Sequence, residues 1–276
     1  MFRHVVSLAV GLALSAAASG CSGRPTYPKE HLAESLQQVL AGEHLQTAVR
    51  FFERTLAVQL EYPDALAQQG NEIAIGPAFQ EAARKVLTAL HRVLLSTDAE
   101  VHFYVLLLSD PHTPGAYLTM VRYIDDLRRA EVSMLNTEEM LERTVFDLNF
   151  VGSKGLTIEQ YVPRGIRMEE FLSWQLARRI QHQLIEVLQL SGRAEVGRCG
   201  GEFHDGEFAF TLNVMPAAEG ATLDEGTVKE IFQTSTTEIA KVLSSYQFKS
   251  FQTVRLILPA MDRNLVLPKT HLQAFQ

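Results

Sequence analysis

The segment that decides the fold of the second half of this chain is FHDGEFAF, residues 203–210. Asp205 and Gly206 are residue types that favour a two-residue β-hairpin turn, because both tolerate a positive φ angle. Phe208 and Phe210 alternate with other residues, and the alternation continues to Leu212 and Val214, so one face of this strand is apolar. The segment predicts a hairpin formed by residues 194–204 and 207–215.

Helical patterns flank this hairpin on both sides. A two-stranded hairpin with one apolar face is marginally stable by itself, so we expect helices to cover it. Residues 168–190 carry a wide apolar face at helical spacing, and Thr222-Leu223-Asp224-Glu225 is typical of a capping box that opens a second helix. Strands are expected at residues 251–258 and 265–267. The order predicted for this half is helix–strand–strand–helix–strand–strand.

The first half follows the same order of patterns. The expected elements are a helix over 30–40, strands near 49–51 and 56–60, a loop over 64–76, an amphipathic helix opened by Pro77, and strands at 101–107 and 117–125. A short helix, capped by Asn136 or Thr137 and running to about Leu148, begins the connection to the second half.

The expected fold class is therefore α+β. It consists of two similar helix–strand–strand–helix–strand–strand units, with antiparallel sheets covered by helices. We place the first unit at residues 29–135, the connecting helix and linker at 136–167, and the second unit at 168–276.

The amino terminus has the proportions of an export signal. A short segment with Arg3 precedes an apolar run over residues 5–18, which is shorter than the roughly 20 residues that a bilayer span needs. The small residues Ala18 and Gly20 precede Cys21, and a polar, proline-containing stretch follows it.

The sequence Ala18-Ser19-Gly20-Cys21 resembles the lipobox of bacterial lipoproteins, with Ala18 where leucine is usual. The resemblance implies that residues 1–20 are a signal peptide, that Cys21 is lipidated and anchors the protein in a membrane, and that residues 21–28 are a tether. Ser22, rather than aspartate, implies the periplasmic side of the outer membrane in a host with two membranes. The alternative is an ordinary secretory signal cut near Gly20, which would leave Cys21 as a free thiol.

Composition limits the partners that we expect. The chain has 276 residues, of which 46% are hydrophobic and 21% charged, and a formal net charge of −7. Because the sequence contains no basic tract, nucleic acid is not an expected partner. With Cys21 lipidated, Cys199 has no second cysteine for an intramolecular disulfide, so the fold must depend on its packing.

The tightest group of potential metal ligands surrounds the predicted hairpin, where Cys199, Glu202, His204 and Asp205 lie within seven residues. A thiolate and an imidazole could hold a metal there, or act as nucleophile and base. The competing interpretation is structural: Asp205 makes the turn, Cys199 fills a small pocket, and five residues along a strand place Cys199 and His204 on opposite faces. Glycines nearby indicate a bulge, which would change the face of the strand on which each of these side chains lies.

Two further positions have a structural and a functional interpretation. Asp125 and Asp126 could perform acid–base work, but arginines flank them, and we favour a solvated, salt-bridged strand end. Trp174 is expected in the core, with an interface anchor as the alternative.

We therefore assign no catalytic, cofactor-binding or metal-binding residue from the sequence. The favoured function is a lipid-anchored envelope protein that binds a protein partner or supports an assembly without catalysis. The first alternative is a lipoprotein that binds a lipid or another small apolar ligand, and the second is an enzyme whose site is assembled from distant residues.

Replacing Cys21 with serine should release the protein from membranes, because serine cannot carry the S-linked acyl group of a lipoprotein anchor. Carbonate washing of membranes, followed by immunoblotting, measures the attached fraction. Ser22→Ala is the matched control and should remain attached. Continued tight attachment of the Cys21→Ser variant would contradict the lipidation.

Overall fold

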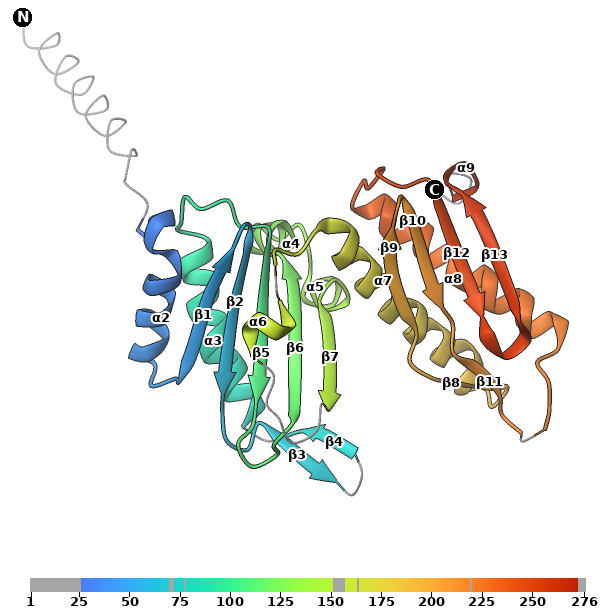
Figure 1. The fold of residues 1–276 in the computed structure, drawn as a ribbon, viewed down its shortest axis with the longest axis horizontal. Helices are drawn as coiled ribbons and strands as arrows, with labels where there is room; N and C mark the ends of the chain where they lie inside the picture. Colours follow the sequence, from blue (N-terminus) through green and yellow to red (C-terminus); the bar gives the residue numbers. More distant parts are fainter. Residues whose placement is uncertain are drawn as a thin grey trace, which may run out of the picture. The chain divides into compact units, whose positions relative to one another are not determined.

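The computed structural model describes residues 26–69, 72–76, 78–150, 157–162, 164–218 and 220–272. Cys21 and the rest of the lipobox lie outside these residues. Within them, no helix is both long enough and apolar enough to cross a membrane. The protein is an α+β protein in which helices pack on antiparallel and mixed sheets (Figure 1).

The chain forms two compact units that do not follow a simple division of the sequence. The first contains residues up to His102 together with Leu106–Tyr117 and Leu148–Tyr161, and the second contains Phe103–Val105, Leu118–Asp147 and Val162–Gln276. Segments far apart in the sequence therefore contribute to one unit.

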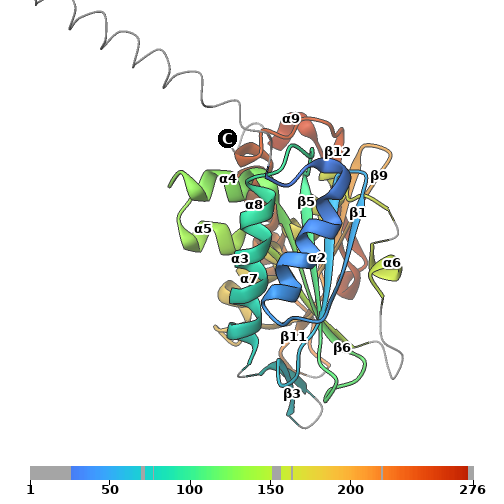
Figure 2. The ribbon, with the colours of Figure 1, turned by 90° about the vertical axis from the view of Figure 1, so that its left-hand side faces the viewer.

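The first sheet has five strands in the order β1-β2-β5-β6-β7. The elements in this part of the chain are η1 (Lys29–His31), α2 (Leu32–Gly42), β1 (Thr47–Phe52), β2 (Thr55–Glu61), β3 (Leu66–Gln69), β4 (Glu72–Ile75), α3 (Phe79–Leu94), β5 (Phe103–Ser109), β6 (Ala116–Tyr123), α4 (Ile124–Glu131), α5 (Thr137–Glu142), β7 (Val145–Phe150) and α6 (Ile158–Tyr161). Helices α2 and α3 lie together on one face, where Leu36, Leu40, Val86 and Leu90 are buried, and α6 lies on the other face (Figure 2).

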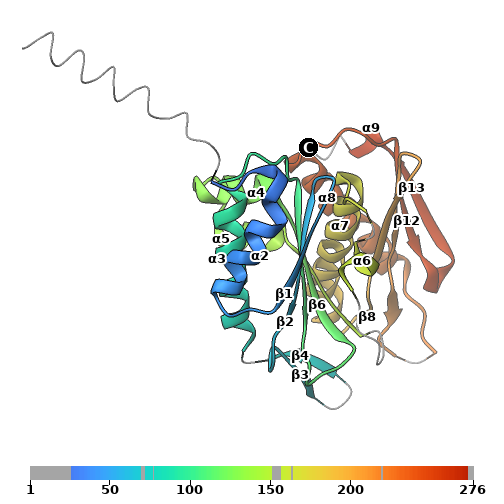
Figure 3. The ribbon, with the colours of Figure 1, turned by 60° about the vertical axis from the view of Figure 1, so that its left-hand side comes forward.

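The second sheet has four strands in the order β13-β12-β10-β9. Its elements are α7 (Met168–Leu184), the π-helical turn η2 (Ile185–Gln189), β8 (Ala194–Val196), β9 (Gly200–His204), β10 (Glu207–Thr211), β11 (Val214–Pro216), α8 (Glu225–Ser245), β12 (Thr253–Leu258), η3 (Pro259–Met261), β13 (Arg263–Pro268) and α9 (Lys269–Leu272). Helices α7 and α8 pack on each other, and α7 also packs on β9 and β10 (Figure 3).

The hairpin predicted around Asp205-Gly206 is confirmed. His204 pairs with Glu207, and Asp205 and Gly206 have φ angles of 48° and 81°. Phe208 and Phe210 are fully buried, as the alternation predicted. The outer ends of the predicted hairpin instead form a separate small sheet of β8 and β11.

Gly201 explains how closely α7 approaches the sheet. A Cβ atom built on Gly201 would lie 2.3 Å from the Ser173 carbonyl oxygen of α7 and 3.0 Å from the Phe210 ring. Only glycine fits at this contact without movement of backbone, because the neighbouring atom on α7 belongs to the main chain.

The second sheet is mixed, which corrects the expectation of purely antiparallel sheets. Strand β10 pairs in parallel with β12, whereas β9–β10 and β12–β13 are antiparallel. Helix α8 causes this, because a helical connection carries the chain back across the sheet before the next strand begins.

Four local predictions differ from the structure. The expected loop over 64–76 contains the paired strands β3 and β4, and the helix expected to reach about Leu148 ends at Glu142, after which β7 begins. The strand expected to reach Asp125 ends at Tyr123.

Helix α8 is capped by Asp224 rather than by Thr222, because the Asp224 carboxylate accepts hydrogen bonds from the Thr227 N–H and hydroxyl. Asn136, and not Thr137, caps α5.

Glu170 in the first turn of α7 provides a test of how that helix begins. Although burial raises its pKa, hydrogen bonds from the Arg164 guanidinium and from the Arg167 side chain and N–H lower the pKa of Glu170 to about 2. The pKa in the unfolded chain is higher, so Glu170 contributes stability above pH 4.5 that is lost as the pH falls towards 2.

Glu170→Gln should therefore lower the free energy of unfolding by about 1–3 kcal/mol at pH 7, because it removes a charge-assisted cap. Urea unfolding of both proteins between pH 7 and pH 2 measures the difference. The difference should shrink below pH 4.5, and a constant difference across this range would contradict the assignment.

Candidate interaction site

The structure separates the residues of the hairpin cluster that the sequence offered as metal ligands or catalysts. Cys199 is buried before β9, and this burial raises the pKa of its thiol. His204 and Asp205 are exposed at the far end of β9. No group of three or more His, Cys, Asp or Glu side chains that could hold a metal ion occurs among the described residues.

The aspartates expected at a solvated strand end lie instead in the first turn of α4. Asp125 is half-buried; burial raises its pKa, but hydrogen bonds from Tyr123 and Arg128 outweigh this effect, so the pKa of Asp125 is lowered. Asp126 is fully buried, and its burial raises the pKa of the carboxyl group. The prediction that both carboxylates are solvated was wrong, because a helix directs adjacent side chains only about 100° apart.

Asp126 is the centre of a buried polar network that holds the carboxyl end of α8. Its two carboxylate oxygens accept hydrogen bonds from Arg143 at 3.0 Å and from the Tyr246 hydroxyl at 2.6 Å. Gln175 of α7 donates to the same hydroxyl at 3.0 Å and to the Arg143 carbonyl at 2.6 Å. The network joins α4, α5, α7 and α8, and within it only the buried Gln175 Oε1 has no hydrogen-bond partner among the described residues.

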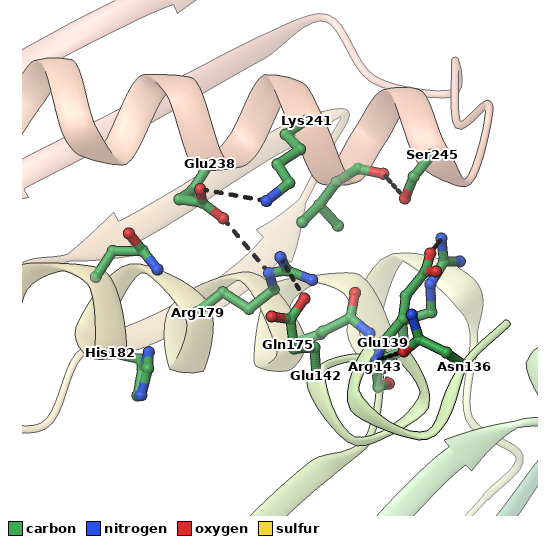
Figure 4. A network of polar contacts seen from close by, with 12 residues as sticks. Asn136, Glu139, Glu142, Arg143, Gln175, Arg179, His182, Glu238, Lys241 and Ser245 are labelled. Atoms are coloured by element: carbon green, nitrogen blue, oxygen red, sulfur yellow. Dashed lines mark hydrogen bonds and ion pairs between the residues drawn. The ribbon is translucent and has the colours of Figure 1, made fainter. Parts of the chain in front are cut away.

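A second polar network joins α5, α7 and α8 (Figure 4). Arg179 of α7 lies between Glu142 of α5 at 3.0 Å and Glu238 of α8 at 3.5 Å. A hollow of about 300 Å³ borders Arg179, Arg178 and His182. Both arginines are already paired, Arg179 with Glu142 and Glu238 and Arg178 with Asp147, which Arg198 shares, so the hollow presents no unpaired arginine to an anionic ligand.

The feature best suited to binding is an apolar groove that we call the α8–β13 groove. It has a volume of about 670 Å³ and is open to solvent. Its lining residues come from α8, β13 and α9 and are Lys229, Phe232, Gln233, Thr236, Leu265, Leu267, Thr270 and His271. The positions of Phe232 on α8 and of Leu265 and Leu267 on β13 make its floor apolar.

The rim of this groove carries positive charge. In the part of the chain that the structure describes, Lys229 and His271 have no carboxylate within ion-pair distance. Lys269, next to the groove, donates instead to the Lys249 carbonyl and lies 5.4 Å from the centre of the Phe251 ring. An apolar floor with the unpaired ammonium group of Lys229 at its rim suits a ligand that has apolar groups and a carboxylate.

The sequence indicated some of these residues but not the groove. Phe232 was expected on the inward face of α8, and it is half-buried at the edge of that face. Leu265 and Leu267 were expected to begin a strand, which is correct. What the sequence lacked was the pairing of β12 with β10, which makes β13 an edge strand. Trp174, expected in the core, is half-buried on α7.

Comparison with known proteins adds no relative: no family model, no curated protein and no solved structure matches this chain.

The buried Asp126 network allows a test with a matched control. Asp126→Asn should lower the free energy of unfolding by about 3 kcal/mol, because it leaves the buried Arg143 paired only with the partly exposed Glu139. Asp125 is one residue away, is half-buried and has partners near the surface. Asp125→Asn should therefore lower the free energy of unfolding by less than about 1 kcal/mol. Urea unfolding followed by circular dichroism measures both values, and equal losses would contradict the role given to Asp126.

Proposed function

We propose that this protein is a lipid-anchored envelope component that binds another protein through the α8–β13 groove and performs no catalysis. Acyl chains on Cys21 hold it on the periplasmic side of the outer membrane. The tether of residues 21–28 separates the folded part from the lipid surface, so that a partner can reach the groove.

The observation that carries this proposal is the apolar groove, open to solvent, between α8 and β13. Phe208, Phe210, Val254, Leu256, Ile231 and Ile239 are fully buried around it, so the groove lies over a packed core. Exposed apolar surface with a polar rim is typical of protein-binding sites. Because the groove is open to solvent, a ligand bound in it can continue beyond it.

An enzymatic role has less support among the described residues. The buried Cys199 thiol has a raised pKa, which disfavours the thiolate, and His204 lies exposed at the other end of β9. The buried Asp126 is engaged by Arg143 and Tyr246.

The second candidate function is the binding of a lipid or another small apolar ligand in the same groove. Its volume lies within the roughly 300–1,000 Å³ of ordinary ligand pockets, and its lining is mostly apolar. A small ligand would normally be enclosed, so the openness of the groove favours a protein partner.

Site-specific photo-cross-linking distinguishes these functions. A benzoylphenylalanine in place of Gln233, an exposed residue that lines the groove, should cross-link to one protein in high yield in the membranes of cells that make this protein. The same substitution at Glu186, which is exposed and does not line the groove, is the control and should give no such product.

Mass spectrometry of the cross-linked products gives the result. A protein joined to position 233 but not to position 186 supports the proposal. Products that carry only lipid would support the second function, and the absence of any product specific to position 233 would contradict both.

A further inference from the structure

Strand β13 forms one edge of the second sheet, and its free side can be identified residue by residue. The Leu212 N–H donates to the Ile257 carbonyl, so Ile257 directs its backbone groups towards β10. Alternate residues of a strand direct their N–H and C=O groups to opposite sides. Leu256 therefore directs its backbone N–H and C=O groups towards β13, where it pairs with Leu265.

It follows that Asn264 and Val266 direct their backbone N–H and C=O groups away from the sheet. No strand of the described residues pairs with this side of β13. Unpaired backbone groups on an edge strand are a template for an added strand. Pro268, which has no N–H, limits the pairing to the region before it.

The first sheet shows what the same arrangement of elements accepts. There the strands of the two hairpins lie in the order β1-β2-β5-β6, with a helix between β2 and β5, as α8 lies between β10 and β12. In the first sheet a fifth strand, β7, pairs next to β6. Strand β13 has the place of β6 in this order, and a short helix follows both directly. The position that β7 fills in the first sheet is thus the free side of β13.

The α8–β13 groove provides the floor for a strand in this position. Leu265 and Leu267 share a face with the buried Leu256 and Val254 of β12, with which they pair. Val266, on the opposite face, is 43% exposed. A strand added beside Val266 would place every second side chain over Phe232 and Thr236 of α8, and a carboxylate on it could reach Lys229 or His271.

We propose that β13 accepts an extended segment of the partner protein as a fifth strand, with apolar side chains in the α8–β13 groove and an acidic residue at Lys229. This inference rests on the proposed function and names the chemistry of the partner. Backbone hydrogen bonds to Asn264 and Val266 hold the segment, and the groove selects its alternate side chains.

The segment of β7 is the natural probe, because it fills the corresponding position in the first sheet. A synthetic peptide with the sequence of residues 144–150, TVFDLNF, places Val145 and Asp147 on one face, so Val145 can enter the α8–β13 groove while Asp147 meets Lys229. With the full-length lipidated protein in detergent micelles, saturating peptide should slow hydrogen exchange of residues 263–267 by about tenfold or more. The exchange of β12, which is already paired on both sides, should not change.

Two variants at one position test the backbone pairing. Val266→Pro removes an N–H that points away from β12, so the strand can remain in the sheet. It should weaken peptide binding about tenfold, because a backbone hydrogen bond and the strand geometry are lost. Val266→Thr keeps the N–H, so its affinity for the peptide should lie within about twofold of that of the unchanged protein. Fluorescence anisotropy of the labelled peptide measures both affinities.

Lys229→Glu keeps the test decisive if Val266→Pro perturbs the fold. Lys229 is exposed, so the reversal of its charge should leave the structure intact. The Lys229→Glu substitution should weaken binding of the peptide about threefold or more. It should not change the affinity for a peptide that carries Asp147→Asn.

Three results would overturn the inference. The first is the absence of peptide-dependent protection at residues 263–267. The second is that Val266→Pro and Val266→Thr bind the peptide with equal affinity. The third is that the unchanged protein is already a dimer through β13 and that Val266→Pro makes it monomeric. If the cross-link at position 233 persists in Val266→Pro, the groove binds a protein without an added strand, so the proposed function stands and only this inference fails.

Discussion

The second unit depends on α8 covering the apolar face of its sheet. Val254, Leu256 and Leu258 point to this face and would be exposed without a helix over them. Both ends of α8 are fixed: Asp224 caps its first turn, and Tyr246 at its last turn donates to the buried Asp126. Because Arg143 and Gln175 complete that contact, the position of α8 is set by groups from three other helices. Fixed ends make the wall of the α8–β13 groove a preformed surface rather than a flexible one.

A preformed groove beside an unpaired strand edge is a liability for a protein that has no partner, because such edges promote association between copies. The charge at this edge limits that risk. Lys229 gives two copies a like charge at the groove, whereas a segment with a carboxylate meets an attractive rim. A lipid anchor on Cys21 would add to this selectivity, since it confines the protein to one membrane and raises the local concentration of partners there.

The sequence predicted the fold well where the signal was local. The alternation of Phe208 and Phe210 and the turn residues Asp205 and Gly206 were sufficient for the central hairpin, and the helical stripes were sufficient for α3, α7 and α8. It failed where distant residues decide the outcome. Asp126 lies within a polar, arginine-rich stretch that is typical of a surface, yet Arg143 and Tyr246, which lie 17 and 120 residues away, allow it to be buried. The groove was likewise out of reach, because only the pairing of β10 with β12 makes β13 an edge.

Hydrogen exchange of the protein in the membranes of cells that make it tests the central claim most directly. The backbone N–H groups of Asn264 and Val266 should exchange rapidly in the purified protein and slowly in the membranes of cells that make it, where a partner occupies the groove. The paired N–H groups of β12 should exchange equally in both samples. Equal, rapid exchange of Asn264 and Val266 in the two samples would contradict the account, because it would show that nothing in the native membrane binds this edge.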